Sequence, residues 1–118
     1  MGYWQGKQRV SYVEDCARAI QMAIETDTGP EPINIGTGKE RTIAGLAKEI
    51  ATIMGYSGDV VFNENGMDGQ PRRCLDTSRA ANVLGFRTQT DLTSGLEKTV
   101  KWYNSNKEKF VDYFDHIQ

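Results

Sequence analysis

The stretch INIGTGKERTIAGLAKEIATIMG, residues 33–55, decides the fold class. Its first four residues alternate between apolar and polar side chains and predict a short strand that ends in a glycine turn. Over 42–55 the apolar residues recur at helical spacing, with Thr42 suited to cap the start of the helix and Gly55 its end. The inward-facing residues of this helix are predicted to be Ile43, Leu46, Ala47, Ile50, Ile53 and Met54. A strand that leads through a turn into a helix indicates a mixed α/β class.

The rest of the chain repeats this alternation of elements. Residues 8–13 and 59–63 predict further short strands, and 64–71 predict an irregular loop. A helix is predicted over 13–26, with Val13, Ala17, Ile20, Ala23 and Ile24 facing inward. A short helix over 76–86 begins at an Asp76–Ser78 capping signature and ends at Gly85. In the helix predicted over 91–110, the inward-facing residues are Leu92, Leu96, Thr99, Val100 and Tyr103.

These elements predict one α/β (mixed α+β) domain over residues 1–118, with about three short strands and four helices. A sheet of three short strands leaves edges that proteins normally pair or cover. We therefore expect a piece that packs against something else.

Composition excludes several partners. A net charge of −2 and a pI near 5.4 leave no basic surface for nucleic acid. The apolar runs are too short to span a membrane, and no signal peptide precedes them. The expectation is a cytoplasmic protein with no nucleic-acid or membrane partner.

The cysteines and the histidine give no strong signal for a site. Cys16 and Cys74 lack metal-type spacing, and Cys16 is expected to be a small buried apolar residue of its helix. A disulfide between the two is a weaker alternative. The only histidine, His116, lies near Asp112 and Asp115 and is interpreted as part of a solvated tail rather than a metal site.

Two short motifs resemble known catalytic signatures. Gly36-x-Gly38 lies between a predicted strand and a helix, as in a dinucleotide fingerprint, but Arg41 replaces the third glycine. A tight turn that needs positive φ explains these glycines equally well. Tyr103 and Lys107 match Tyr-x-x-x-Lys, a catalytic acid/base pair. We interpret Tyr103 as a core residue and Lys107 as a solvated one.

The segment GMDGQPRRCLDTSRAANVLGF, residues 66–86, holds a third candidate. Arg72 and Arg73 follow a turn constrained by glycine and proline, and paired guanidiniums suit a phosphate. Asp68 could accept ligand hydroxyls or orient an arginine. From chemistry alone, a phosphate site and a solvated surface both remain open.

Four segments together resemble the extended short-chain dehydrogenases of the NAD-dependent epimerase/dehydratase family. QRVSYVEDCARAI resembles the family segment in which an arginine precedes Tyr/His-Val-x-Asp-x-Ala, and INIGTG resembles its Asn-x-Gly-x-Gly strand. MDGQPRRCLDTSR resembles Asp-Gly-x-Pro-Arg-Arg/Lys-x-x-Asp-x-Ser-Arg, most like the GDP-L-fucose synthase group. LTSGLEKTVKWY resembles the closing Leu-x-x-Gly-Leu-x-x-Thr-x-x-Trp-Tyr helix. The match runs over residues 4–107 in the family's order.

The resemblance implies the C-terminal, nucleotide-sugar-binding portion of a Rossmann-type enzyme. Arg9 resembles the family arginine that reaches the ligand diphosphate, and Arg72 or Arg73 its second cation, with Asp68 beside the sugar nucleotide. Asn34, Gly36, Gly38, Val13 and Asp15 would be architectural. Gly45 departs from the family, whose members usually carry a charged or polar residue there; it is predicted to lie in mid-helix, where it costs up to ~1 kcal/mol relative to alanine.

The family's glycine fingerprint and catalytic Tyr-x-x-x-Lys lie upstream of the matched region. We therefore expect no catalytic residue and no bound cofactor in this chain, with NAD or NADP held by the missing Rossmann half of the parent enzyme. The expected ligand is a GDP- or UDP-sugar, bound without turnover. The alternatives are a self-associating binding or assembly module, which makes a homo-oligomer, and a domain whose arginines contact only water.

Overall fold

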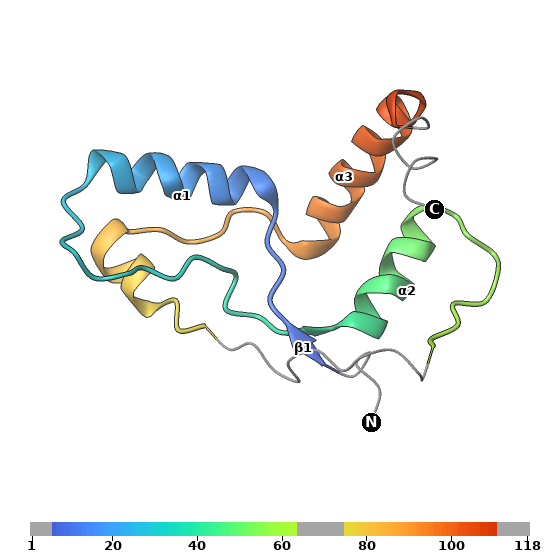
Figure 1. Ribbon diagram of the computed structural model, residues 1–118, viewed down its shortest axis with the longest axis horizontal. Helices are drawn as coiled ribbons and strands as arrows, with labels where there is room; N and C mark the ends of the chain where they lie inside the picture. The colour runs from blue at the N-terminus through green and yellow to red at the C-terminus, as the bar shows by residue number, and fades with distance from the viewer. Residues whose placement is uncertain (1–5, 64–74, 111–118) are drawn as a thin grey trace.

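The computed structural model describes residues 6–63 and 75–110 (Figure 1). This part of the chain is mixed α/β, and two very short strands pair antiparallel, with Lys7 opposite Thr42 and Gln8 opposite Arg41. The elements, in order, are β1 (Lys7–Gln8), α1 (Val13–Glu25), β2 (Arg41–Thr42), α2 (Ile43–Ile53), the π-helical turn η2 (Ala80–Leu84), α3 (Leu92–Asn106) and the 3-10 turn η3 (Lys107–Lys109).

The prediction of about three strands was wrong in number and in position. Residues 33–36 and 59–63 form no strand, and the first strand ends at Gln8 instead of continuing to 13. Extended backbone becomes a strand only when a neighbour completes its hydrogen-bond ladder. No described segment lies in position to do so for 33–36, where Ile33 and Ile35 instead pack their side chains against the core.

The four predicted helices are confirmed, with their caps. Thr42 Oγ1 accepts from the Gly45 N–H at 3.0 Å and caps α2. At the other end of α2, Gly55 has φ +70°, and the Tyr56 and Gly55 N–H groups donate to the Ala51 and Thr52 carbonyls. This is a Schellman motif, which needs glycine because a side chain is strained at that φ. Gly85, at φ +66°, ends η2 in the same left-handed conformation.

The placement of Gly45 in mid-helix was wrong. Gly45 is the third residue of α2, and its N–H makes the capping bond to Thr42. A Cβ added at Gly45 would lie 3.0 Å from Thr42 Oγ1. The usual gain from replacing a helical glycine with alanine is therefore opposed by crowding of the cap.

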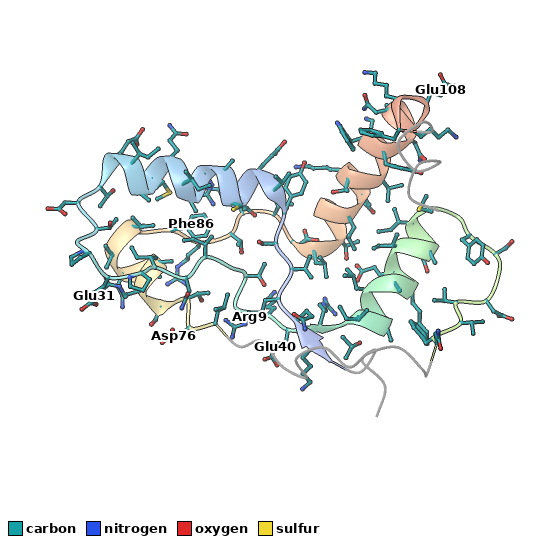
Figure 2. The ribbon with its side chains drawn as sticks, viewed as in Figure 1. Arg9, Glu31, Glu40, Asp76, Phe86 and Glu108 are labelled. Atoms are coloured by element: carbon teal, nitrogen blue, oxygen red, sulfur yellow. The ribbon has the colours of Figure 1, made fainter. Side chains whose placement is uncertain are left out.

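The core lies between α1 and η2. Ala19, Ala80, Leu84 and Phe86 are its buried apolar side chains among the described residues. Phe86 lies directly beneath α1 in Figure 2, and the Arg18 guanidinium stacks 4.8 Å from its ring centroid. Arg79 connects η2 to the 27–32 loop. Its guanidinium donates a hydrogen bond to the Thr28 carbonyl and forms an ion pair with Glu31.

Of the predicted inward face of α1, Ala23 is confirmed and the other four residues were wrong. Val13, Ile20 and Ile24 are 70%, 58% and 81% exposed, and Ala17 is exposed as well. The face that packs on the core instead carries Asp15, Ala19, Met22 and Ala23. Cys16, expected to be buried, is an exposed free thiol. The helix has two apolar faces, and the one with small side chains fits closely against η2.

Helices α2 and α3 pack together at the other end of the molecule (Figure 1). Leu92, Leu96 and Val100 are half-buried as predicted for α3, whereas Thr99 and Tyr103 are exposed. Gly95 is buried because the Tyr12 side chain lies against it, 3.1 Å from where a Cβ would stand. Asp91 caps α3 by accepting from the Ser94 N–H at 3.0 Å.

The molecule is extended. Its radius of gyration is 17.1 Å, whereas a compact domain of this length has roughly 13.5 Å. It exposes 9114 Å², against roughly 6,400 Å² for a compact monomer of its mass. No helix in the described ranges is long and apolar enough to cross a membrane.

Candidate functional site

Arg9 follows β1 and is the site residue predicted from sequence that the structure describes. Its side chain is half-buried, and the Nε and Nη1 atoms of its guanidinium are inaccessible to water. The guanidinium of arginine is positively charged, and the field of a partly buried charge is poorly screened by solvent. Arg9 therefore supplies a fixed positive charge close to the strand pair.

The positive charge of Arg9 acts on the carboxylate of Asp76. The Ser78 N–H donates to Asp76 Oδ1 at 2.9 Å. This bond, the Ser78 hydroxyl and the charge of Arg9 together hold the pKa of Asp76 below its usual value, although desolvation opposes them. Figure 2 shows Arg9 and Asp76 in the same region of the molecule. The segment that leads into η2 therefore lies close to the residue that follows β1.

The glycine turn lies against the residue after Asp76. Cβ atoms added at Gly36 and Gly38 would stand 3.7 and 3.6 Å from the Thr77 side chain. Gly38 has φ +73°, so the sequence-based explanation by positive φ is confirmed for it. Arg41 and Thr42 form β2 before α2 begins, so the turn does not open a helix as a dinucleotide fingerprint requires.

Two cavities with basic and hydroxyl side chains in their walls adjoin this turn and share Thr37 and Thr88. One, of about 110 Å³, has Lys39 and Arg41 in its lining. The other, of about 240 Å³, has Arg87 in its lining and extends to Thr77. Basic side chains and hydroxyl groups together can bind the oxygens of an anionic ligand.

Helix α1 holds the cavity wall in place through the buried carboxylate of Asp15. Its two oxygens accept from the backbone N–H groups of Gln89 and Thr90, each at 3.0 Å. Burial raises the pKa of Asp15, but these bonds and Arg18 outweigh it, so the net pKa is lowered. Arg18 also donates to the Arg87 carbonyl at 2.5 Å. The expected architectural role of Asp15 is thus visible in its contacts.

The other residues that the sequence singled out lie outside this site or outside the described residues. Asp68, Arg72 and Arg73 lie outside the described residues, as do Cys74 and His116. No group of histidine, cysteine and acidic side chains in the described ranges could hold a metal ion. Tyr103 is 40% exposed beside an apolar groove of α2 and α3, so its interpretation as a core residue was wrong. Lys107 is exposed, as predicted.

Sequence reasoning did not single out the cavity residues. Lys39, Arg41, Thr77, Thr88 and Arg87 come from segments up to 49 positions apart, and only the fold brings them together. The one signal for this site in the sequence was Asp76. It follows Arg73 by three residues and begins the Asp-x-Ser-Arg pattern.

The chain is similar in sequence to enzymes that act on nucleotide sugars, as their names state. The chain is 42% identical over 78 residues to GDP-L-fucose synthase of Escherichia coli, covering 66% of this chain and 24% of that one. It is 32% identical over 107 residues to GDP-L-colitose synthase of Yersinia pseudotuberculosis, covering 90% of this chain and 34% of the relative. The chain belongs to the epimerase/dehydratase family of extended short-chain dehydrogenases. No protein-family model matches it.

Solved structures of epimerase/dehydratase proteins share the fold. UDP-glucose 4-epimerase of Thermotoga maritima, solved with UDP-glucose, matches with a TM-score of 0.82 and 29% identity over 90% of this chain and 34% of its own. A GDP-L-fucose synthetase of Naegleria fowleri, solved with NADP, matches with a TM-score of 0.83 at 23% identity over 91% of this chain and 34% of its own. The chain therefore spans about a third of the proteins that it matches.

Proposed function

We propose that this chain is the nucleotide-sugar-binding portion of an NAD(P)-dependent epimerase, dehydratase or reductase, and corresponds to the C-terminal part of its relatives. The observation that carries the proposal is the buried guanidinium of Arg9 beside Asp76. The cavities lined by Lys39, Arg41 and Arg87 nearby support it. A GDP- or UDP-sugar brings two negative charges on its diphosphate, which such a cationic region would stabilise.

Arg9 is proposed to bind diphosphate oxygens. Because Nε and Nη1 of Arg9 are inaccessible to water, Arg9 would act on the diphosphate through its poorly screened positive charge rather than through two parallel donors. Asp76 would help to orient Arg9 through the attraction between their opposite charges. Arg73 precedes Asp76 by three residues in the sequence. Arg72 or Arg73 would supply the second cation and Asp68 a contact to the sugar.

The chemical step is proposed to need residues beyond this chain. The turn at Gly36 and Gly38 does not fit a dinucleotide because β2 separates it from α2. In the described ranges, the side chains in the two cavity walls that could act as a general acid or base are Lys39 and Asp91, and Asp91 caps α3. We therefore propose that NAD or NADP binds to the part of the fold that this chain does not span, and that this chain alone positions the substrate without turning it over.

Phosphorus NMR tests the proposal. Adding the chain to GDP or to UDP is expected to shift or broaden both phosphate resonances of at least one nucleotide, because the diphosphate itself is bound. Guanosine monophosphate is the matched control and should respond more weakly. If the diphosphate resonances stay unchanged when the protein is added at millimolar concentration, the proposal is contradicted. Turnover of GDP- or UDP-sugars with NAD(P)H by the pure chain would contradict it as well.

A further inference from the structure

The smaller cavity contains two positive charges that form no ion pair with any described residue. It has a volume of about 110 Å³ and lies where the segment after β1, the glycine turn and the start of α3 meet. Its cations are Lys39 and Arg41, which come from the turn and from β2. Like charges that share a small cavity repel each other unless an anion neutralises them.

Two hydroxyl groups in the same wall are available to an anion. Within the described ranges, the hydroxyls of Thr88 and Thr90 make no hydrogen bond, although the Thr90 N–H donates to Asp15 at 3.0 Å. The buried Asp15 carboxylate thus fixes the backbone that carries Thr90 without using its hydroxyl. The hydroxyl of Thr37, by contrast, bonds to both backbone groups of Lys39. The wall therefore offers two hydroxyl donors beside two cations.

The carboxylate of Asp91 in this lining is bonded to other donors. Its two oxygens accept from the Ser94 N–H at 3.0 Å and from the Ser94 hydroxyl at 2.8 Å. Glu49, on α2, likewise accepts from the hydroxyl of Thr93 at 2.5 Å. With two positive charges and one negative charge, the described lining keeps a net positive charge.

We propose that this cavity binds one small tetrahedral oxyanion, which is free phosphate or the phosphate group of a phosphorylated sugar. The anion would lie between Lys39 and Arg41 and accept hydrogen bonds from the hydroxyls of Thr88 and Thr90. Pockets for drug-sized ligands have volumes of about 300–1,000 Å³, so a cavity of about 110 Å³ suits a single small group.

The oxyanion site is separate from the proposed diphosphate contact. Val10 lines this cavity, whereas Arg9 and Asp76 do not. The cations of the cavity add to the positive field around Arg9 without having to touch a nucleotide. The inference therefore goes beyond the proposed function and does not rest on it.

Titration of the chain with sodium phosphate, followed by ¹H–¹⁵N NMR at an ionic strength held constant with sodium chloride, tests the site. We expect the amide resonances of Thr88 and Thr90 to shift saturably. Lys39→Ala and Arg41→Ala should each weaken binding about threefold to fivefold, as for an exposed ion pair. Thr90→Val, which removes only the hydroxyl, should also weaken it. Lys101→Ala is the matched control, because it removes an exposed positive charge from α3 outside the cavity.

Glucose 1-phosphate, as a second ligand, identifies the source of the oxyanion. Equal affinities of the ester and of free phosphate would assign the site to phosphorylated sugars, and weaker binding of the ester would assign it to free phosphate. Either result supports the site.

Three results would overturn the proposal: no saturable shift, shifts that chloride reproduces, or an unchanged phosphate affinity in folded Lys39→Ala and Arg41→Ala. Loss of phosphate binding in Arg9→Ala would also overturn it, because the phosphate would then lie at the proposed diphosphate contact. Since no nucleotide is present, failure here leaves the phosphorus NMR test of the proposed function unaffected.

Discussion

Phe86→Ala is expected to destabilise the chain by about 3–5 kcal/mol, the usual cost of removing a buried aromatic side chain. Phe86 is 3% exposed and is the largest member of a core that otherwise contains Ala19, Ala80 and Leu84. Small domains have only about 5–15 kcal/mol of stability in total, and so modest a core places this one at the lower end. The variant should be largely unfolded at 25 °C.

Urea unfolding followed by circular dichroism measures this effect. Phe86→Leu keeps most of the apolar volume and should cost about 1 kcal/mol. Val61→Ala, at a side chain that is 85% exposed, should leave the midpoint unchanged. A midpoint for Phe86→Ala within error of the wild type would show that α1 and η2 do not form the core.

Asp15→Asn is expected to cost about 2–3 kcal/mol, because a buried hydrogen-bond donor loses its charged acceptor. Asp15 accepts from the N–H groups of Gln89 and Thr90 with separate oxygens, both at 3.0 Å. Asparagine has one oxygen, so its amide NH₂ would face one of these N–H groups. Helix α1 would then hold Thr90, which lines the smaller cavity, less firmly.

The same variant should flatten the dependence of stability on pH. The pKa of Asp15 is lowered in the folded chain, so its stabilising effect is complete above the ordinary aspartate pKa and is lost as pH falls through the folded value. The wild type should lose stability on acidification from about pH 5 to pH 2, and Asp15→Asn should lose less. Asp76 and Asp91, whose pKa values are also lowered, contribute to the remaining slope.

Glu14→Gln is the matched control for both Asp15 experiments. It removes a neighbouring carboxylate from an exposed position on the same turn of α1. An unfolding free energy and a pH profile for Asp15→Asn that coincide with those of Glu14→Gln would contradict the structural role of Asp15.

The helices were predictable because their signals are local. The Thr42 cap, the left-handed Gly55 and Gly85, and the apolar spacing of α2 all act within a few residues. Short-range chemistry of this kind can be interpreted from one sequence. For the same reason, β2 was missed, since Arg41 and Thr42 become a strand only through pairing with Lys7 and Gln8.

The faces of the helices could not be predicted with equal success. Periodicity identified an apolar stripe on α1, but not that Ala19 and Met22 on the other side would meet the core. Which apolar face turns inward depends on the partner element, and small side chains allow the close approach of η2. The candidate site was only partly predictable: Arg9 came from the resemblance, whereas the partnership with Asp76 and the cationic cavities arises from tertiary structure.

Calorimetric titration of the chain with a GDP- or UDP-sugar tests the central claim most directly. The account predicts saturable binding at one site, weakened roughly tenfold to a hundredfold by Arg9→Ala, as expected for one charged hydrogen-bonding group. Arg9→Lys should lose less because it keeps the charge. Lys101→Ala, which removes an exposed positive charge on α3, should bind as the wild type does. No saturable binding to either nucleotide sugar, or equal affinity in folded Arg9→Ala, would contradict the claim.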